Sequence, residues 1–240
     1  RTRLTPGVLL SGACPVRRHA PSANFYSHRT LWSIPVMNKK LIWSLIVTGL
    51  SWSASMPVAS AAGDAVIGKK KFYTCVGCHG VAGYTNAYPT FHVPRLGGQH
   101  ADYIVAALQA YRSGERKHAS MVSNSTSLSD ADMADIGAYL SKFEGLNSSL
   151  PTTGDAVAGK QKAAACGGCH GEDGNSAAPN FPRLAGQYES YIVRALEDYK
   201  SGHRNNGMMA GFAAGLSEAD MKDIGAYYAS QKKGLTTSGE

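Results

Sequence analysis

The chain has few cysteines, and their arrangement does not indicate structural disulfides. Of the five, Cys14 lies near the N-terminus, and the other four form two Cys-x-x-Cys pairs, Cys75 with Cys78 and Cys166 with Cys169. A histidine directly follows each pair. Paired thiols at this spacing are typical of redox chemistry, metal binding or cofactor attachment, so we expect the four cysteines to have a chemical role.

Acidic residues are absent from the first 61 positions, which contain seven of the 24 basic residues. The remaining 17 basic residues are balanced by 17 acidic ones, although the whole chain has a formal charge of +7. A nucleic-acid-binding protein is expected to have its basic residues in the folded body of the chain. The near-neutral body therefore excludes nucleic acid as the expected partner.

The chain also lacks an apolar run of the roughly 20 residues that a membrane-spanning helix needs. Residues 37–61 instead have the three parts of a secretory signal: a basic start at Met37, a short apolar core, and small residues before Ala62. We expect a Sec-type signal, export to the periplasm, and a mature protein with at most peripheral membrane association. Residues 1–36 precede this signal and are expected to be either an over-extension of the gene model or an artificial addition to the natural protein.

Two halves of the remaining chain repeat one another. Residues 63–69 recur as 154–160 and residues 75–80 as 166–171, both at an offset of 91, and residues 94–99 recur as 182–187 at an offset of 88. A loop that is three residues longer in the first half accounts for the change of offset. The repeat predicts a first domain at 62–147, a linker at 148–153 and a second domain at 154–240.

Each repeat has the pattern of a small helical domain. Asp64 and Asp155 are expected N-caps, and Ser-x-x-Asp capping signals begin at Ser129 and Ser217. A middle helix has apolar residues at helical spacing in both repeats, from Ile104 in the first, and no segment has the alternating pattern of a strand. We predict an all-α fold with two tandem domains, each wrapped around a large apolar cofactor that completes its small core.

The Cys-x-x-Cys-His motif indicates covalent attachment of a c-type haem, in which the thiols bond to the vinyl groups and the histidine ligates the iron. The first haem is assigned to Cys75, Cys78 and His79, and the second to Cys166, Cys169 and His170. A thioredoxin-like pair would need a βαβ setting, and a zinc site would need two such pairs within one domain. Neither condition is met.

Alignment of the repeats also indicates the second axial ligands. Met121 aligns with Met209 and Met133 with Met221, whereas the other histidines of the body have no histidine partner: His92, His100, His118 and His203. Met133 and Met221 lie in an apolar helical stripe and are expected to be core residues. Met121 and Met209 precede that helix, in a segment expected to be a loop, and are assigned as iron ligands. Met208 is the alternative to Met209.

The ordered set of motifs resembles the dihaem cytochrome c4 family, in which one chain contains two class I cytochrome c domains. The resemblance extends from about residue 63 to 233 and includes both haem motifs, the two Pro-Arg-Leu-x-Gly-Gln segments and the paired methionines. It implies that the carbonyls of Pro94 and Pro182 accept a hydrogen bond from the haem-ligating histidines. Arg95 and Arg183 either face the haem propionates or are solvated charges.

With histidine and methionine on opposite faces, each iron would have no open position, and its chemistry would be reduced to one-electron transfer. We therefore predict a periplasmic electron carrier and not an enzyme. The resemblance implies a cytochrome bc-type complex as donor and a terminal oxidase as acceptor. Two alternatives remain: the cytochrome subunit of a sulfide-oxidising flavocytochrome, and a dihaem peroxidase with one exchangeable ligand.

Overall fold

The structure is a computed structural model that describes residues 63–144 and 150–238. The predicted extension, signal peptide and start of the linker lie outside the described residues. Within them no helix is long and apolar enough to cross a membrane.

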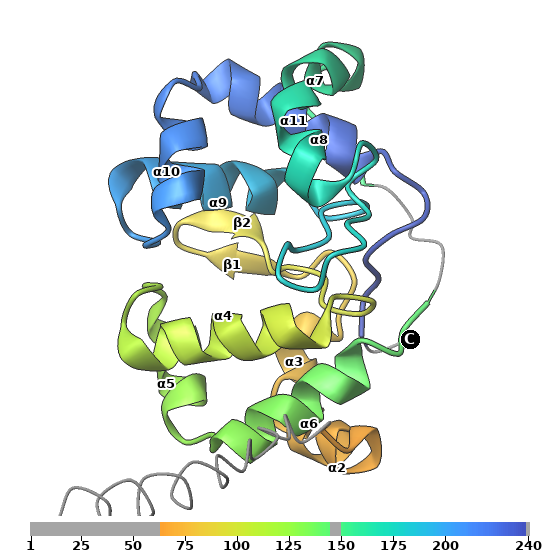
Figure 1. The fold of residues 1–240 in the computed structure, drawn as a ribbon, viewed down its shortest axis with the longest axis vertical. Helices are drawn as coiled ribbons and strands as arrows, with labels where there is room; N and C mark the ends of the chain where they lie inside the picture. The colour runs from red at the N-terminus through yellow and green to blue at the C-terminus, as the bar shows by residue number, and fades with distance from the viewer. Residues whose placement is uncertain (1–62, 145–149, 239–240) are drawn as a thin grey trace, which may run out of the picture. The chain divides into compact units, whose positions relative to one another are not determined.

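The elements of the first repeat are the helices α2 (Ala65–Lys71), η1 (Phe72–Thr74), α3 (Val76–His79), α4 (Ala101–Ser113), α5 (Ala119–Thr126) and α6 (Asp130–Leu140), and the strands β1 (Thr85–Ala87) and β2 (Thr90–His92) (Figure 1).

The second repeat contains the same succession of α-helices, without the strands and without a counterpart of η1: α7 (Ala156–Lys162), α8 (Ala164–His170), α9 (Glu189–Ser201), α10 (Gly207–Ala214) and α11 (Glu218–Ala229). The predicted all-α class is confirmed. The predicted caps are also present, because Asp64 and Asp155 accept backbone N–H groups of α2 and α7. Ser129 and Ser217 each form a complete capping box with the aspartate three residues later.

In each repeat the first and last long helices cross at a glycine. A Cβ atom on Gly68 of α2 would lie 1.9 Å from the carbonyl oxygen of Asp135 in α6, and one on Gly159 of α7 would lie 1.9 Å from that of Asp223 in α11. The Asp135 and Asp223 side chains accept the backbone N–H of Asp64 and Asp155, at 2.7 and 2.8 Å. Only glycine permits this approach, so Gly68 and Gly159 set the distance between the first and last helices of their repeats.

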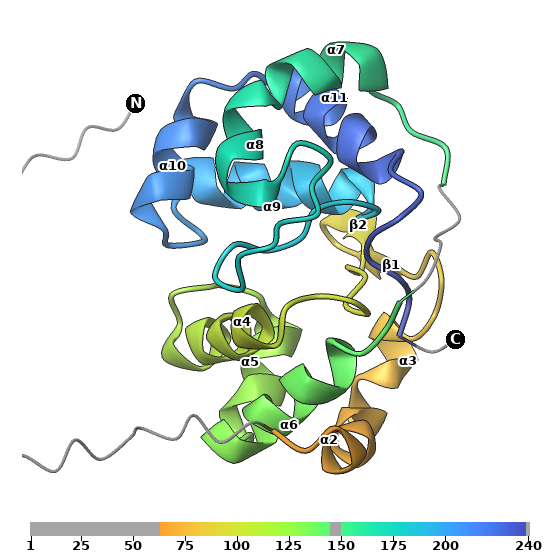
Figure 2. The same cartoon turned by 45° about the vertical axis from the view of Figure 1, so that its right-hand side comes forward.

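Two features differ from the sequence-based expectation. The longer loop of the first repeat forms the β1–β2 hairpin, with Thr85 opposite His92. Two three-residue strands have little stability alone, and the hairpin lies against α9 of the second repeat, where the ring and backbone of His92 both contact Ser190 Oγ (Figure 2). The segments around Met121 and Met209, expected to be loops, are the short helices α5 and α10.

Reciprocal hydrogen bonds join the two repeats. The Gln187 side chain accepts the backbone N–H of Arg95 and donates to its carbonyl, both at 3.0 Å. The Gln99 side chain makes the same pair of bonds with Arg183, at 2.9 and 3.0 Å. Both glutamines are at most 5% exposed. Equivalent residues exchange equivalent bonds, which is the pattern of a contact with two-fold symmetry.

The C-terminal segment returns to the first repeat. Leu235 is fully buried and donates its backbone N–H to Ala185 of the second repeat. The next residue, Thr236, exchanges two backbone hydrogen bonds with Gly97 of the first repeat, at 2.9 and 3.0 Å. The Ser238 hydroxyl then donates to the carbonyl of His79. Residues that the repeat assigned to the second domain thus complete the surroundings of the first haem motif.

The reciprocal bonds predict the effect of removing one glutamine. Gln187→Ala leaves the buried N–H and carbonyl of Arg95 without these partners and is expected to lower the free energy of unfolding by about 2 kcal/mol. Urea unfolding of the haem-loaded protein, followed by circular dichroism, measures the change. Gln161→Ala, at an exposed position of α7, is the matched control and should stay within about 0.5 kcal/mol of wild type. Equal stability of the two variants would contradict the assigned role of the interface.

Candidate haem sites

The Cys-x-x-Cys-His motifs lie on short helices. Cys75 is the N-cap of α3, which ends at His79, and Cys166 and Cys169 lie within α8, which ends at His170. Helical spacing places the first cysteine and the histidine of each motif four residues apart, on one face of the helix. All four thiols are free. Within the described ranges no three His, Cys, Asp or Glu side chains gather as a metal cluster.

Both histidines are buried and oriented by a proline carbonyl. Nδ1 of His79 lies 3.0 Å from the Pro94 oxygen, and Nδ1 of His170 lies 2.8 Å from the Pro182 oxygen, the contacts that the family resemblance implies. Burial lowers the pKa of both rings, which keeps them neutral, while the proline hydrogen bond acts in the opposite direction. With Nδ1 donating its proton to the carbonyl, Nε2 retains its lone pair as a metal ligand.

The predicted methionine ligands occupy equivalent positions in α5 and α10. His118 and Asn206 are the N-caps of these helices, and each accepts the backbone N–H of the methionine three residues later, Met121 or Met209. Met209 is partly buried and packs against the core of the second repeat, whereas Met208 is 57% exposed. This difference favours Met209 over Met208 as the ligand.

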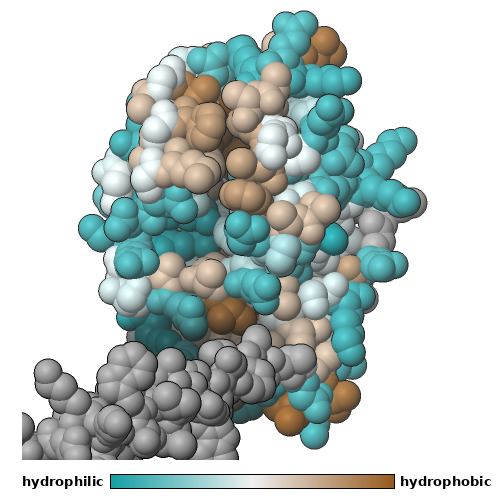
Figure 3. Space-filling view, in the orientation of Figure 1, coloured by the Kyte–Doolittle hydropathy of each residue, from teal (hydrophilic) through white to brown (hydrophobic). Residues whose placement is uncertain are grey.

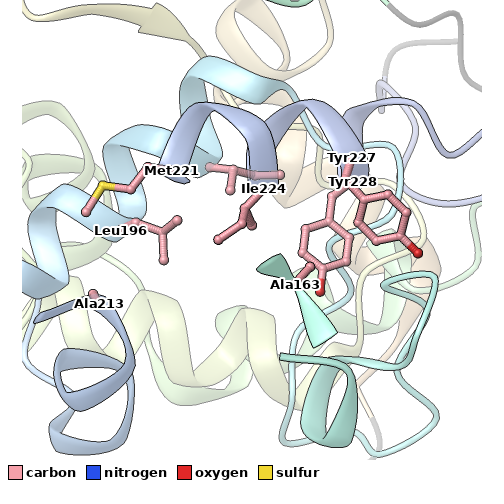
Figure 4. Packing of buried hydrophobic residues seen from close by; sticks show 8 residues of the cluster. Ala163, Leu196, Ala213, Met221, Ile224, Tyr227 and Tyr228 are labelled. Carbon is pink, nitrogen blue, oxygen red and sulfur yellow. The ribbon is translucent and has the colours of Figure 1, made fainter. Parts of the chain in front are cut away.

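The other matched pair of methionines behaves differently. Met133 and Met221 are 0% and 2% exposed, within α6 and α11, as expected for core residues. In the second repeat the side chains of Leu196, Met221, Ile224 and Tyr228 point toward a common region bordered by α8, α9 and α11 (Figure 4). Cys166 and Met209 both pack against this cluster, so the thiol and the thioether of the second haem site contact the same group of apolar side chains.

The two sites are not identical. Leu140 of the first repeat is replaced by Tyr228 in the second, and both side chains are fully buried. The Tyr228 hydroxyl interacts with the Cys166 thiol of the same site, and burial, the largest cause, raises the pKa of the phenol. The surfaces differ as well: α10 exposes Met208 and Phe212, whereas α5 is rich in Ser, Thr and Asn. Figure 3 shows apolar residues grouped in the upper half of this face of the molecule.

Arg95 and Arg183 lie at the contact between the repeats. The Arg95 guanidinium donates to the carbonyl of Gly186, and that of Arg183 donates to the carbonyl of Gly98 at 2.8 Å. Arg95 is 4% exposed, so it is not a solvated surface charge. Nε of Arg183 is buried and has no partner among the described residues, which leaves a donor for another group. The propionate role of both arginines stays a prediction.

Sequence reasoning missed a second pair of buried arginines, Arg116 and Arg204. They are equivalent positions at the offset of 88, each 9% exposed, and each donates to a tyrosine of the other repeat. The internal alignment contained one signal, the match of Arg116 with Arg204 at the offset of 88, but the polar residues around both arginines gave no sign of their burial.

The residues present fit a covalently attached haem in each repeat. Each site offers two free thiols, an imidazole with Nε2 available and a neighbouring apolar cluster. Met209 packs against the cluster of the second repeat, and Met121 is partly buried in the first. The cysteines and histidine would attach and ligate the haem from one side, and Met121 or Met209 would close the other. A haem placed there would also supply acceptors for buried donors such as Nε of Arg183.

Comparison with known proteins agrees with this geometry. The cytochrome c family model matches residues 65–144 and 156–232. Cytochrome c4 of Pseudomonas aeruginosa is 53% identical over 88 residues, a match that spans 37% of this chain and 44% of that protein. This chain therefore aligns with less than half the length of that relative.

Two solved structures resemble most of the two-repeat body. Cytochrome c4 of Acidithiobacillus ferrooxidans is 34% identical with a TM-score of 0.58, over 66% of this chain and 99% of that one. Thiosulfate dehydrogenase of Marichromatium purpuratum is 26% identical with a TM-score of 0.62, over 69% of this chain and 40% of that one. The family match covers both repeats, and each match contains its own Cys-x-x-Cys-His motif. The chain therefore belongs to the dihaem cytochrome c4 family, with one covalently attached haem c in each repeat.

Proposed function

We propose that the protein is a periplasmic carrier of single electrons, with His79 and Met121 as axial ligands of the first haem and His170 and Met209 as those of the second. The observation that carries the proposal is the pairing of a buried, carbonyl-oriented histidine with an equivalent methionine in both repeats. Two protein ligands leave no position for oxygen, peroxide or a substrate.

The chain's own residues suit this role in three ways. The Pro94 and Pro182 carbonyls hold each imidazole in one orientation, so the ligand set need not move when the charge of the iron changes. Buried apolar side chains exclude water from the region that the haem would occupy. The thiols of each motif attach the group permanently. When bound, the haem supplies an iron that accepts and releases one electron.

The proposed donor is a cytochrome bc-type complex and the proposed acceptor a terminal oxidase, the partners implied by membership of the cytochrome c4 family. The resemblance to part of a thiosulfate dehydrogenase supports a second candidate, in which an enzyme of that kind is the electron donor. The flavocytochrome alternative would require a flavin-bearing partner in the purified complex. The peroxidase alternative would require steady turnover of peroxide by the isolated protein.

The donor can be tested directly. Stopped-flow measurements would follow reduction of the oxidised protein by a purified bc-type complex with quinol, and separately by a thiosulfate dehydrogenase with thiosulfate. The main proposal expects faster reduction by the bc-type complex, followed by re-oxidation on addition of a terminal oxidase. Reduction by the thiosulfate enzyme alone would favour the second candidate, and sustained peroxide consumption would exclude a simple carrier.

The ligand assignment predicts a selective effect of methionine substitutions. Met121→Leu should convert only the first haem to a five-coordinate, high-spin state, and Met209→Leu only the second, because leucine retains the packing but offers no lone pair. Absorption and electron paramagnetic resonance spectra of the oxidised protein report the spin state of each iron.

Three control variants test the assignment of Met121 and Met209 as iron ligands. Met133→Leu and Met221→Leu alter buried core methionines and should leave both haems six-coordinate. Met208→Leu, at an exposed position, should also leave the spectra unchanged. Loss of the sixth ligand in Met208→Leu but not in Met209→Leu would move the ligand by one residue. Unchanged spectra in both ligand variants would refute methionine ligation.

Export and haem loading can be measured together. We expect a mature chain that starts near Ala62 and carries two haems, because the signal at residues 37–61 would be removed on export. The intact mass of protein purified from the periplasm of a host that matures c-type cytochromes reports both quantities. A mass corresponding to one haem, or peptides from residues 1–36, would contradict the assignment.

A further inference from the structure

One peptide unit of the first repeat is hydrogen-bonded on both of its sides. Its carbonyl group belongs to Pro94 and lies 3.0 Å from Nδ1 of His79. Its N–H group belongs to Arg95 and donates to Oε1 of Gln187, in the second repeat, at 3.0 Å. Because a peptide unit is planar and rigid, a single group of fixed geometry connects this glutamine to the imidazole of the opposite repeat.

The second repeat has the same arrangement with the roles of the repeats exchanged. The Pro182 carbonyl lies 2.8 Å from Nδ1 of His170. The N–H of the next residue, Arg183, belongs to the same peptide unit and donates to Oε1 of Gln99, in the first repeat, at 2.9 Å. In both halves of the molecule, the histidine of a haem motif is therefore connected to a buried glutamine of the other half.

Both glutamine side chains have a fixed orientation. In addition to the bonds with the arginine backbone, Oε1 of Gln99 accepts the N–H of His100 at 3.0 Å, and Oε1 of Gln187 accepts that of Tyr188 at 3.1 Å. His100 and Tyr188 are the N-caps of α4 and α9, the longest helices of the two repeats. Each carboxamide is thus held in place relative to the start of a long helix.

The two N-cap residues also bond to the opposite repeat. The Tyr188 hydroxyl accepts the backbone N–H of Gly83 at 2.8 Å, and Nε2 of His100 lies 2.8 Å from the carbonyl oxygen of Ser176. Gly83 and Ser176 lie in the loops that connect each haem motif to the proline that orients its histidine. Each loop is therefore fixed to the other repeat at two points, the N-cap residue and the glutamine before it.

We propose that Gln187 is a positioning residue for His79 and Gln99 a positioning residue for His170, so that each repeat sets the ligand hydrogen bond of the other. The inference rests on the proposed axial ligation by these histidines and goes beyond it, because it assigns control of each haem to the opposite repeat. Donation from the N–H side polarises a peptide unit and makes its carbonyl a better acceptor. A stronger bond from Nδ1 makes the imidazole a more basic ligand, which favours oxidised iron.

The proposal predicts that a substitution in one repeat changes the redox potential of the other. Gln187→Met retains a long side chain but cannot bond to the Arg95 backbone, so the bond from His79 to Pro94 should weaken. The midpoint potential of the first haem should rise, with a smaller change at the second, and Gln99→Met should have the reverse effect. Spectroelectrochemical titration of the haem-loaded protein, with each haem distinguished by nuclear magnetic resonance, gives the two potentials.

The ring proton of each histidine reports the same effect directly. In the oxidised protein the iron shifts the resonance of the Nδ1 proton of its ligand, and transfer into deuterium oxide measures how fast that proton exchanges. Exchange at His79 should be faster in Gln187→Met than in wild type and unchanged in Gln99→Met. Exchange at His170 should show the opposite pattern. A purely structural role of the glutamines would not produce this exchange of effects between the repeats.

Two further variants complete the experiment. Gln161→Met makes the same substitution at an exposed position of α7 and should shift neither haem. Gln187→Asn retains the carboxamide on a shorter side chain, should shift the first haem in the same direction by less, and serves as the test if Gln187→Met does not fold. The absorption spectrum of each variant should remain six-coordinate, which separates a failure of this inference from a failure of the proposed axial ligation.

Three results would overturn the inference. If Gln187→Met lowers the urea midpoint but gives the potentials of Gln161→Met, the glutamine stabilises the contact between the repeats and does not position the ligand. Equal shifts of both haems in each variant would indicate a general loosening of that contact. A larger shift at the haem of the substituted repeat would show that the glutamine acts within its own half of the molecule.

Discussion

The orientation of each histidine and the contact between the repeats depend on one short segment. Pro94 and Arg95 are consecutive, yet the carbonyl of Pro94 orients His79 while the backbone of Arg95 pairs with Gln187 of the other repeat. The equivalent segment starting at Pro182 does the same in the second repeat. Since a peptide unit is rigid, a displacement of the interface would be passed to the ring that ligates the iron. The haem sites and the interface form one structural unit.

Local sequence signals predicted much of this arrangement. The haem motifs, the aspartate caps, the Ser-x-x-Asp capping boxes and the apolar helical stripes are encoded within a few residues, and the structure has all of them. Comparison of the repeats separated the core methionines Met133 and Met221 from Met121 and Met209. The helical character of the segments with the latter pair was missed, because short polar sequences such as that of α5 have no clear apolar period.

Features that depend on contact between distant residues could not be read from the sequence. The extra residues of the first repeat were visible as a change of offset, but their strand pairing depends on packing against α9. Arg95 was expected at a propionate or in solvent; its burial excludes the solvated alternative, and its guanidinium donates to a carbonyl of the opposite repeat. The bonds from Arg116 and Arg204 also cross the repeats, and they become apparent only when the relative orientation of the repeats is known.

The path of the C-terminal segment has a consequence for biogenesis. Thr236 and Ser238 bond to Gly97 and to the carbonyl of His79, about 140 to 160 positions earlier in the chain. During synthesis the N-terminal repeat emerges first, but these bonds cannot form until the last residues have followed. The half that is made first is therefore completed last, and the Cys75 motif stays without the C-terminal segment that bonds to His79 throughout that interval, while haem attachment still needs access to its thiols.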